Sequence, residues 1–444
     1  MKKFLVILLS LGLIVAFGAT ASAADVKFGG SYYLVGVYDD NANLKGSDVG
    51  YSRAYFYTRT RLQPVFTIAE GLTFTARMDA LEKQWGNTNW KSTTAVDGDT
   101  TSSRKNGAPG STQKVQESLE FERGYVTFKT AIGQFDVGYQ AAGAWGTVFA
   151  DNGTTTPRIK FSTKAGPLAL VGIYEKSFDA DTSAVAGYAG KADADNDNYF
   201  LAAVYGFKGG NAGLLYGYIV GNSNRLAATP FRTRLHLLTP YLKATFGPVY
   251  VEAELAYWGG NSQEFDNVAG ATDVKKNGYS AYALLKTNLG PAYIGAQVGW
   301  SSGDDNATDD TDNSSGGGGA DWKPALILMN DDMATWAGGV GTNVANSRKA
   351  NILLYNVFGG FNPTPKLNLE LAMTSAAKDK SLANEVSKNL GIEFDVKASY
   401  KLYDNLTYMV GMGYLWTGDY FKGTNSANQI GNDYILMNKL SLSF

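Results

Sequence analysis

The chain has 444 residues, with 39 Lys and Arg against 41 Asp and Glu, and it contains no cysteine. This balance offers no basic surface for nucleic acid, and the lack of cysteine excludes disulfides and thiolate metal sites. A mean hydropathy of −0.18 argues against a bundle of membrane-spanning helices. Aromatic residues at 13%, with 52 Gly and only 11 Pro, are typical of many strands joined by turns.

The first residues have the pattern of a secretory signal peptide. Lys2 and Lys3 precede an apolar run over residues 4–17, and the small residues 21–23 form a cleavage site. We therefore expect a signal peptide over residues 1–23 and a mature start at Ala24; a retained membrane anchor is the alternative, but the apolar run is short. Removing the two lysines leaves 37 basic against 41 acidic residues, a charge of −4.

The mature sequence is a succession of alternating segments. In residues 53–62, Arg53, Arg59 and Arg61 share one face, while Phe56 and Leu62 share the other. The same alternation of polar and apolar side chains recurs in residues 72–80, 158–163, 251–255 and 392–402. A two-residue period predicts strands, each with one charged and one apolar face.

Short turns and long polar gaps separate these strands in alternation. Turn residues occur at 70–71, 131–133, 165–167, 209–211, 247–248, 290–291, 362–365 and 404–405, and the long gaps fall near 39–50, 85–117, 141–157, 178–197, 221–231, 259–277, 302–350, 378–388 and 418–431. This rhythm predicts an all-β fold, a transmembrane antiparallel β-barrel of about 18 strands, with 16 as the alternative, short periplasmic turns and long extracellular loops. No composition shift marks a boundary, so residues 24–444 form one expected domain.

Aromatic residues gather at the predicted strand ends, as in an interfacial girdle. We expect Trp258, Trp300, Trp416, Tyr420 and Phe421 at the long-loop rim, and Phe246, Tyr250, Phe361, Tyr403 and Phe444 at the short-turn rim. The alternation slips after Glu122 and Arg123, which predicts a β-bulge there.

The chain ends with "LMNKLSLSF", in which Leu440, Leu442 and Phe444 share one face. An even number of strands returns the last strand to the rim where the first begins, and pairing the two leaves no edge in lipid. We expect the apolar face of this strand to contact lipid.

This ending resembles that of the outer-membrane porins of Gram-negative bacteria. "GQFDVGYQ", residues 133–140, looks like the porin strand that leads into an inward-folded third loop, here residues 141–157. "KASYKLYDNLTYMVGMGYLWTGDYF", residues 397–421, is similar to the closing hairpin of porins from sulfate- and metal-reducing bacteria. The resemblance implies a place in the cell outer membrane, contact with lipid and lipopolysaccharide, recognition of Phe444 by the barrel-assembly machinery, and a homotrimer.

A barrel of this size encloses an aqueous lumen, and the polar strand faces would form its wall. The predicted pore-lining residues are Arg53, Arg59, Arg61, Arg77, Asp79, Glu120, Glu122, Arg123, Arg158, Arg232, Arg234, Glu252, Glu254, Glu370, Glu393 and Asp395. Opposed fixed charges orient water and admit small polar solutes while they resist apolar ones. The plainer alternative is that these charges pair with one another across strands.

Two loops compete as the constriction of this lumen. Residues 141–157 are favoured by their position in the porin-like pattern. Residues 302–350 form the longest gap and contain an apolar stretch at 325–329 that would prefer to pack inside.

Metal and catalytic sites find little support in the sequence. Asp193, Asp195 and Asp197 have the spacing of EF-hand ligands, but Asn198 replaces the glycine and Val204 the bidentate glutamate. Acidic loops of this kind are more often solvated, with weak divalent binding that bridges lipopolysaccharide as the alternative. His236, the only histidine, is expected on the lumen wall with Arg232 and Arg234. We expect no cofactor, no metal and no enzymatic activity.

The sequence thus predicts a passive diffusion channel for small hydrophilic solutes and ions. The nearest rival is a channel selective for anionic solutes such as carboxylates, phosphate or acidic sugars, because three arginines on one face repel one another without a partner. A secreted β-rich adhesin or surface-layer protein is the rival of another class, since it could share the signal peptide and the alternation.

Overall fold

The computed structural model describes residues 25–85, 119–180, 193–304, 310–316, 318–333, 339–341, 349–382 and 384–444. The expected signal peptide and most of the gap at 85–117 lie outside the described residues. Within the part of the chain that the structure describes, no helix is long and apolar enough to cross a membrane.

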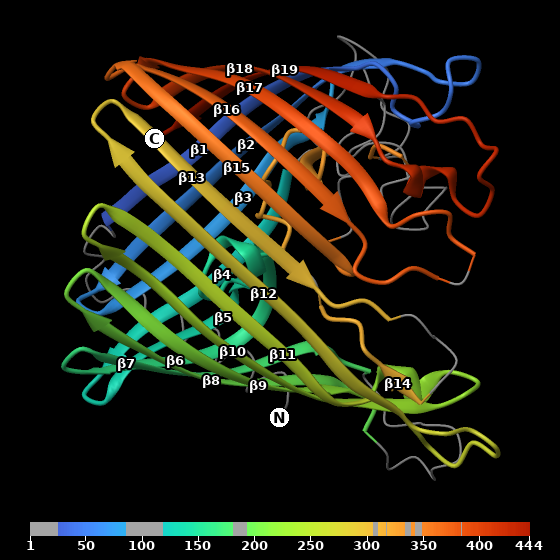
Figure 1. The fold of residues 1–444 in the computed structure, drawn as a ribbon. Helices are drawn as coiled ribbons and strands as arrows, with labels where there is room; N and C mark the ends of the chain where they lie inside the picture. Colours follow the sequence, from blue (N-terminus) through green and yellow to red (C-terminus); the bar gives the residue numbers. More distant parts are fainter. Residues whose placement is uncertain are drawn as a thin grey trace.

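The described strands form one antiparallel sheet, apart from a two-residue strand in a loop (Figure 1). They are β1 (Asp25–Asp39), β2 (Arg53–Ala69), β3 (Leu72–Gln84), β4 (Leu119–Thr130), β5 (Gly133–Ala142), β6 (Thr154–Ala165), β7 (Leu168–Phe178), β8 (Asn196–Phe207), β9 (Gly210–Gly221), β10 (Phe231–Phe246), β11 (Val249–Phe265), β12 (Val274–Leu289), β13 (Ala292–Ser301), β14 (Thr311–Asp312), β15 (Ile352–Thr364), β16 (Leu367–Ala377), β17 (Asn389–Tyr403), β18 (Leu406–Thr417) and β19 (Asp433–Ser443). Only β14 pairs in parallel, with β12, so 18 strands form the wall.

The sheet closes on itself through β1 and β19. These strands pair antiparallel, with Leu34 opposite Leu440, while β1 also pairs with β2 on its other edge. The backbone of Phe444 exchanges two hydrogen bonds with Gly30, at 2.8 and 3.0 Å. The predicted closed barrel of 18 strands is confirmed, because every wall strand has a neighbour on both sides.

The short turns and long loops follow the predicted rhythm, with one clear difference. The gap expected at 259–277 is shorter, since β11 continues to Phe265 and β12 begins at Val274. Gly260 has a φ of +111° and stands beside a register shift in β11. Glycine permits this irregularity within the strand, and it also made the sequence there resemble that of a loop. The predicted bulge in β4 is confirmed, because the β3–β4 register shifts where Glu122 lies.

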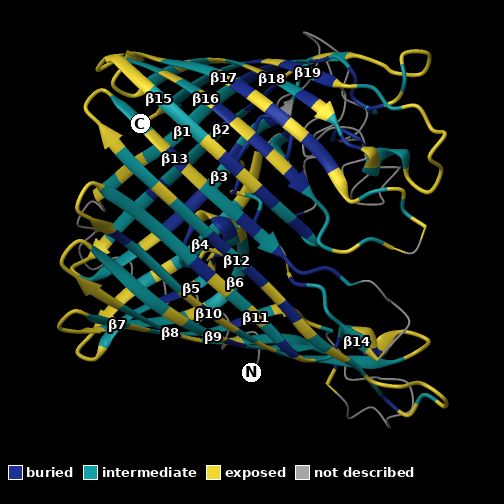
Figure 2. Ribbon diagram, viewed as in Figure 1, coloured by how far each residue is buried: buried dark blue, intermediate teal, exposed yellow. Residues whose placement is uncertain are grey.

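In wall strands such as β17, exposed residues alternate with buried ones (Figure 2), and many of the exposed residues are apolar. In β17, for example, Ile392, Phe394 and Val396 are exposed outward, while the intervening Glu393 and Asp395 are buried inside. Among the predicted girdle residues, those exposed are Phe246, Phe361, Tyr403, Trp416 and Phe444. Two others face inward: the hydroxyl of Tyr250 donates to Glu252, and Trp258 lies against Gly316 in the connection between β13 and β15.

Candidate functional site: the lumen and its inner loops

Two loop segments fold into the ring of strands (Figure 1). The first, residues 143–153, connects β5 to β6; we call it the first inner loop. The second, residues 318–333, belongs to the connection between β13 and β15; we call it the second inner loop. The two loops that compete as the constriction in the sequence therefore both enter the lumen.

The first inner loop packs on the inner faces of β10, β11 and β12. The indole Nε1 of Trp145 donates to the carbonyl of Thr239 at 3.0 Å, and its ring meets Tyr241 edge to face. The backbone N–H of Thr147 donates to the carboxylate of Glu254 at 2.6 Å. Phe149, in a short 3₁₀ helix (Val148–Ala150), stacks on Tyr282 with ring centroids 5.2 Å apart.

Hydrogen bonds join the two inner loops to each other. The N–H of Gly319 donates to the carbonyl of Phe149 at 2.5 Å, and that of Asp321 donates to the carbonyl of Asp151 at 2.9 Å. The Phe149 ring also contacts Trp322, with centroids 5.0 Å apart. Burial raises the pKa of Asp151, although the N–H of Trp145 donates to its carboxylate and opposes this shift. The loops thus form one folded unit inside the barrel.

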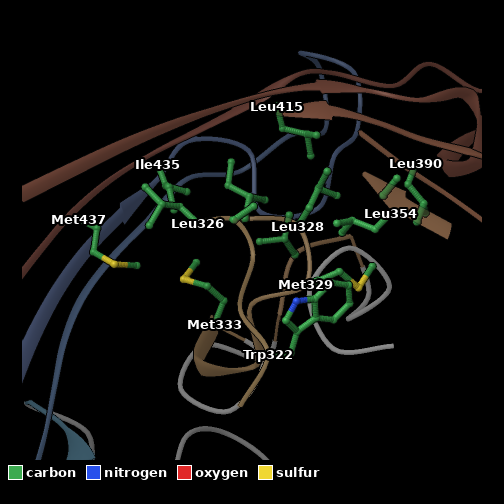
Figure 3. Packing of buried hydrophobic residues seen from close by; sticks show 14 of the residues in the cluster. Trp322, Leu326, Leu328, Met329, Met333, Leu354, Leu390, Leu415, Ile435 and Met437 are labelled. Atoms are coloured by element: carbon green, nitrogen blue, oxygen red, sulfur yellow. The ribbon is translucent and has the colours of Figure 1, made fainter. Parts of the chain in front are cut away.

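An apolar cluster fixes the second inner loop against the wall (Figure 3). From the loop come Trp322, Leu326, Leu328, Met329 and Met333; from β15, β17, β18 and β19 come Leu354, Leu390, Leu415, Ile435 and Met437. Ile327, Leu328, Met329 and Met333 are fully buried. Burying such side chains contributes about 1.5–3 kcal/mol each, so this contact favours an ordered loop.

Beside this cluster, one carboxylate accepts three backbone hydrogen bonds from the second inner loop. The N–H groups of Leu326 and Ile327 donate to Oε1 of Glu393 at 3.0 and 2.7 Å, and that of Leu328 donates to Oε2 at 2.6 Å. Asp395 accepts a further bond from Leu326 at 3.3 Å. A buried carboxylate is costly unless it is hydrogen-bonded, and these donors satisfy it.

A ladder of uncharged polar side chains supports the same loop from β13, β15 and β16. Trp322 Nε1 donates to Gln297 at 3.0 Å, Gln297 donates to Asn356 at 3.0 Å, and Asn356 donates to Thr374 at 2.8 Å. Such buried networks favour one arrangement of the chain because each member is satisfied only there.

An ion pair holds the second inner loop to the residues before β15. Lys349 donates to Asp331 at 2.9 Å and to the carbonyl of Gly319 at 2.5 Å. Burial lowers the pKa of Lys349 and raises that of Asp331, while their pairing opposes both shifts.

The inner wall of β2, β3 and β4 carries interleaved arginines and carboxylates. Arg61 donates twice to Asp79, at 2.7 and 2.6 Å, and Arg77 donates through Nε to Glu122 at 2.7 Å. Arg59 lies 3.8 Å from both Asp79 and Glu82 and over the ring of Tyr33. Bidentate and shared pairs of this kind fix the positions of the guanidinium groups.

Arg123 differs from its neighbours on this wall. Within the described ranges it forms no ion pair, and its Nε is buried without a hydrogen-bond partner. It lies opposite Arg77 in the β3–β4 register, so the two arginines are cross-strand neighbours. Further round the wall, Arg158 pairs with Glu175 at 3.2 Å.

Most predicted pore-lining residues lie on the inner face. These are Arg53, Arg59, Arg61, Arg77, Asp79, Glu120, Glu122, Arg123, Arg158, Glu252, Glu254, Glu370, Glu393 and Asp395. Loops cover three of them, because Glu254, Glu393 and Asp395 are only 2, 0 and 1% exposed. These three carboxylates contact the inner loops and do not border the open lumen.

The prediction that Arg232 and Arg234 line the lumen is wrong, as is the inward placement of His236. On β10 these side chains alternate with the inner-face residues Thr239 and Tyr241 and share the face of the exposed Leu238. His236 stacks on Tyr216 and Tyr218 of the outer surface. Arg232 pairs with Glu264, and Arg234 donates to Asn222 at 2.8 Å, both near the long loops.

The expected mutual repulsion of Arg53, Arg59 and Arg61 is relieved by protein carboxylates. Arg53 lies 2.6 Å from Asp39 and also donates to the carbonyl of Gly339 at 2.6 Å. Since Asp79 serves both other arginines, the set requires no anionic solute. These three arginines therefore pair with carboxylates across strands, which is the plainer of the two alternatives.

Several important inner residues were not predicted. Asp39, Glu82 and Glu175 are counter-charges, while Gln297, Asn356 and Thr374 support the second inner loop. The alternation within β13, β15 and β16 places the last three inward, so the strand pattern contained a signal that could have found them.

The carboxylates of the lumen include one possible cation site. Among the described residues, one group of three acids lies close enough to hold a cation, Asp79, Glu82 and Glu122. Arg61 and Arg77 already donate to two of its members, so the group is an ion-pair cluster. Fixed charges of both signs along a polar wall can order water and orient small solutes.

The family comparison matches part of the chain. A family model described as "OmpA-like transmembrane domain" matches residues 289–439. No curated protein sequence matches the chain.

Solved structures resemble the chain over nearly its whole length. A BenF-like porin from Pseudomonas fluorescens Pf-5 is 13% identical, with a TM-score of 0.52, covering 95% of this chain and 99% of its own. OccK2 (OpdF) of Pseudomonas aeruginosa, in complex with glucuronate, is 12% identical, with a TM-score of 0.52 and coverage of 95 and 97%. OccK8 (OprE) of the same organism is 12% identical, with a TM-score of 0.51 and coverage of 94 and 98%. The chain therefore has the 18-stranded barrel fold of outer-membrane porins.

Proposed function

We propose that this protein is an outer-membrane porin, a passive diffusion channel for small hydrophilic solutes and ions. One observation carries the proposal: a closed wall with an apolar exterior has charged residues such as Arg59, Arg61 and Glu122 partly exposed on its inner face. An apolar exterior suits lipid, and a charged interior suits water. An adhesin or surface-layer protein would need neither a closed wall nor an apolar outer band.

A planar-bilayer recording of the detergent-purified protein tests this proposal. Stepwise ohmic openings are expected, with weak ion selectivity because the inner wall carries nearly balanced charges. The matched control is the same protein after heat denaturation, which should give no steps. Absence of conductance from protein that still shows heat-modifiable migration would contradict the porin proposal and favour a closed barrel with another role.

A channel selective for anionic solutes is the second candidate. It is favoured by Arg123, which has no carboxylate within ion-pair distance in the described ranges and stands beside Arg77. A guanidinium suits carboxylates and phosphates because its charge is permanent and its donors form a fork. A strongly anion-selective reversal potential under a salt gradient would support this candidate over general diffusion.

The remaining expectations from the porin resemblance belong to the same proposal. They are cleavage of a signal peptide before Ala24, contact with lipopolysaccharide, recognition of Phe444 by the barrel-assembly machinery, a homotrimer, and kinship with porins of sulfate- and metal-reducing bacteria. The mass of the purified complex in detergent and the amino-terminal sequence of the mature protein test the trimer and the cleavage directly.

A further inference from the structure

We infer that Glu393 is the residue that positions the second inner loop, and that it thereby sets the size of the open path through the barrel. This inference rests on the proposed channel function and assigns a role that the strand pattern does not reveal. The wall fixes an outer limit for the path, but the inner loops decide how much of it is open.

Geometry distinguishes Glu393 from the other inner carboxylates. Glu370 pairs with Lys397 of β17 at 2.5 Å and accepts from Tyr293 of β13 at 2.7 Å, so both partners belong to wall strands. Glu393 instead accepts three consecutive backbone N–H groups of the second inner loop, at 2.6–3.0 Å. It is a link between wall and loop.

The segment that Glu393 holds presents three consecutive backbone donors to it, and only the first, the N–H of Leu326, has a second and longer bond, to Asp395. Three successive N–H groups, those of residues 326–328, converge on one carboxylate, as in the backbone concavities that bind anions. Buried N–H groups are costly when unpaired, so removing the acceptor destabilises this arrangement of the loop. The apolar side chains beside it favour burial but do not fix the direction of the backbone.

Glu393→Gln is the most direct test because it preserves the shape of the side chain. The amide nitrogen would face a backbone N–H donor, so at least one of the three hydrogen bonds is lost. In single-channel recordings we expect unitary conductance to rise by about twofold or more, with fluctuating sublevels, because a wider and less ordered path carries more ions. Glu370→Gln is the matched control: it makes the same substitution at another carboxyl group of the inner wall and should retain a single steady level.

The outcomes separate this inference from the proposed function. If the folded wild-type protein conducts nothing, the channel proposal fails. If it conducts and folded Glu393→Gln has the same conductance and noise, the positioning role of Glu393 is wrong. Should Glu393→Gln not fold, Glu393→Asp keeps the charge but is one methylene too short to reach all three donors, and should also raise conductance.

Discussion

The two halves of the inner wall use charged residues in opposite ways. On β11 and β17, Glu254 and Glu393 are buried beneath the inner loops and accept backbone hydrogen bonds from them. On β2, β3 and β4, arginines and carboxylates pair with one another, and Arg59, Arg61 and Glu122 stay partly exposed around the buried Asp79. Strand alternation places both sets on the inner face. A residue on the inner face therefore borders the open path only where no inner loop covers it.

Removing the large buried side chain of Trp322 should have the greatest effect on the stability of the inner loops. Trp322 is fully buried against Phe149 and Tyr282, and its indole donates to Gln297. Trp322→Ala should destabilise the ordered loop by about 3–5 kcal/mol, as expected for a large buried aromatic side chain. Limited proteolysis in detergent measures this, with faster cleavage near residue 322 and an intact barrel. Unchanged cleavage would contradict the buried contact.

Glu254→Gln should have a smaller effect on the first inner loop. It weakens the acceptor of the Thr147 N–H, at an expected cost of about 1–3 kcal/mol for a buried partner. The measurement is the frequency of conductance fluctuations, which should increase. Glu252→Gln is the control, since that residue accepts from Tyr250 of its own strand, and equal noise in both variants would argue against loop anchoring by Glu254.

Arg123→Gln tests the part of the inner wall that β2, β3 and β4 form. Because Arg123 has no carboxylate partner in the described ranges, its loss removes positive charge without freeing a counter-charge. The anion-to-cation permeability ratio should fall by roughly a factor of two, an effect limited by screening at physiological salt. Reversal potentials measured at low and high salt check this result. A ratio that stays constant at low salt would exclude Arg123 from the open path.

Arg234→Gln should have the smallest effect on permeation. The residue lies on the outer face with His236, so neither conductance nor ion selectivity should change, and the stability cost of a surface substitution is about 0.5 kcal/mol or less. The same recordings serve as the measurement. A shift as large as that of Arg123→Gln would contradict the outward placement.

The sequence was sufficient to predict the wall and the two loops that enter the lumen, but not the contacts that hold these loops in place. Period-two alternation and turn residues depend on neighbours a few positions away, so the strand number, the closure at Phe444 and the inward side of Glu393 could be predicted. The hydrogen bonds from residues 326–328 to Glu393 join positions more than 60 residues apart, and no local pattern encodes such a contact.

The wrong placement of Arg232, Arg234 and His236 has a physical explanation. Polarity marks the lumen side of a strand only where the other side touches lipid. Near the long loops, the outer face of β10 meets other polar groups such as Glu264 and Asn222, so charged residues are equally stable there. Alternation at a strand end therefore gives two faces without saying which one is inside.

Closure of the barrel through β1 and β19 has a consequence for folding kinetics. Contacts at this seam, such as that between Asn41 and Asp433, join residues 392 positions apart. Hairpins such as β4–β5 can form locally, but the seam requires the ends of a very long chain segment to meet, and such non-local contacts form slowly. Until they form, β1 and β19 each present an open edge of unpaired backbone groups, so the unsealed barrel is the stage most exposed to mispairing.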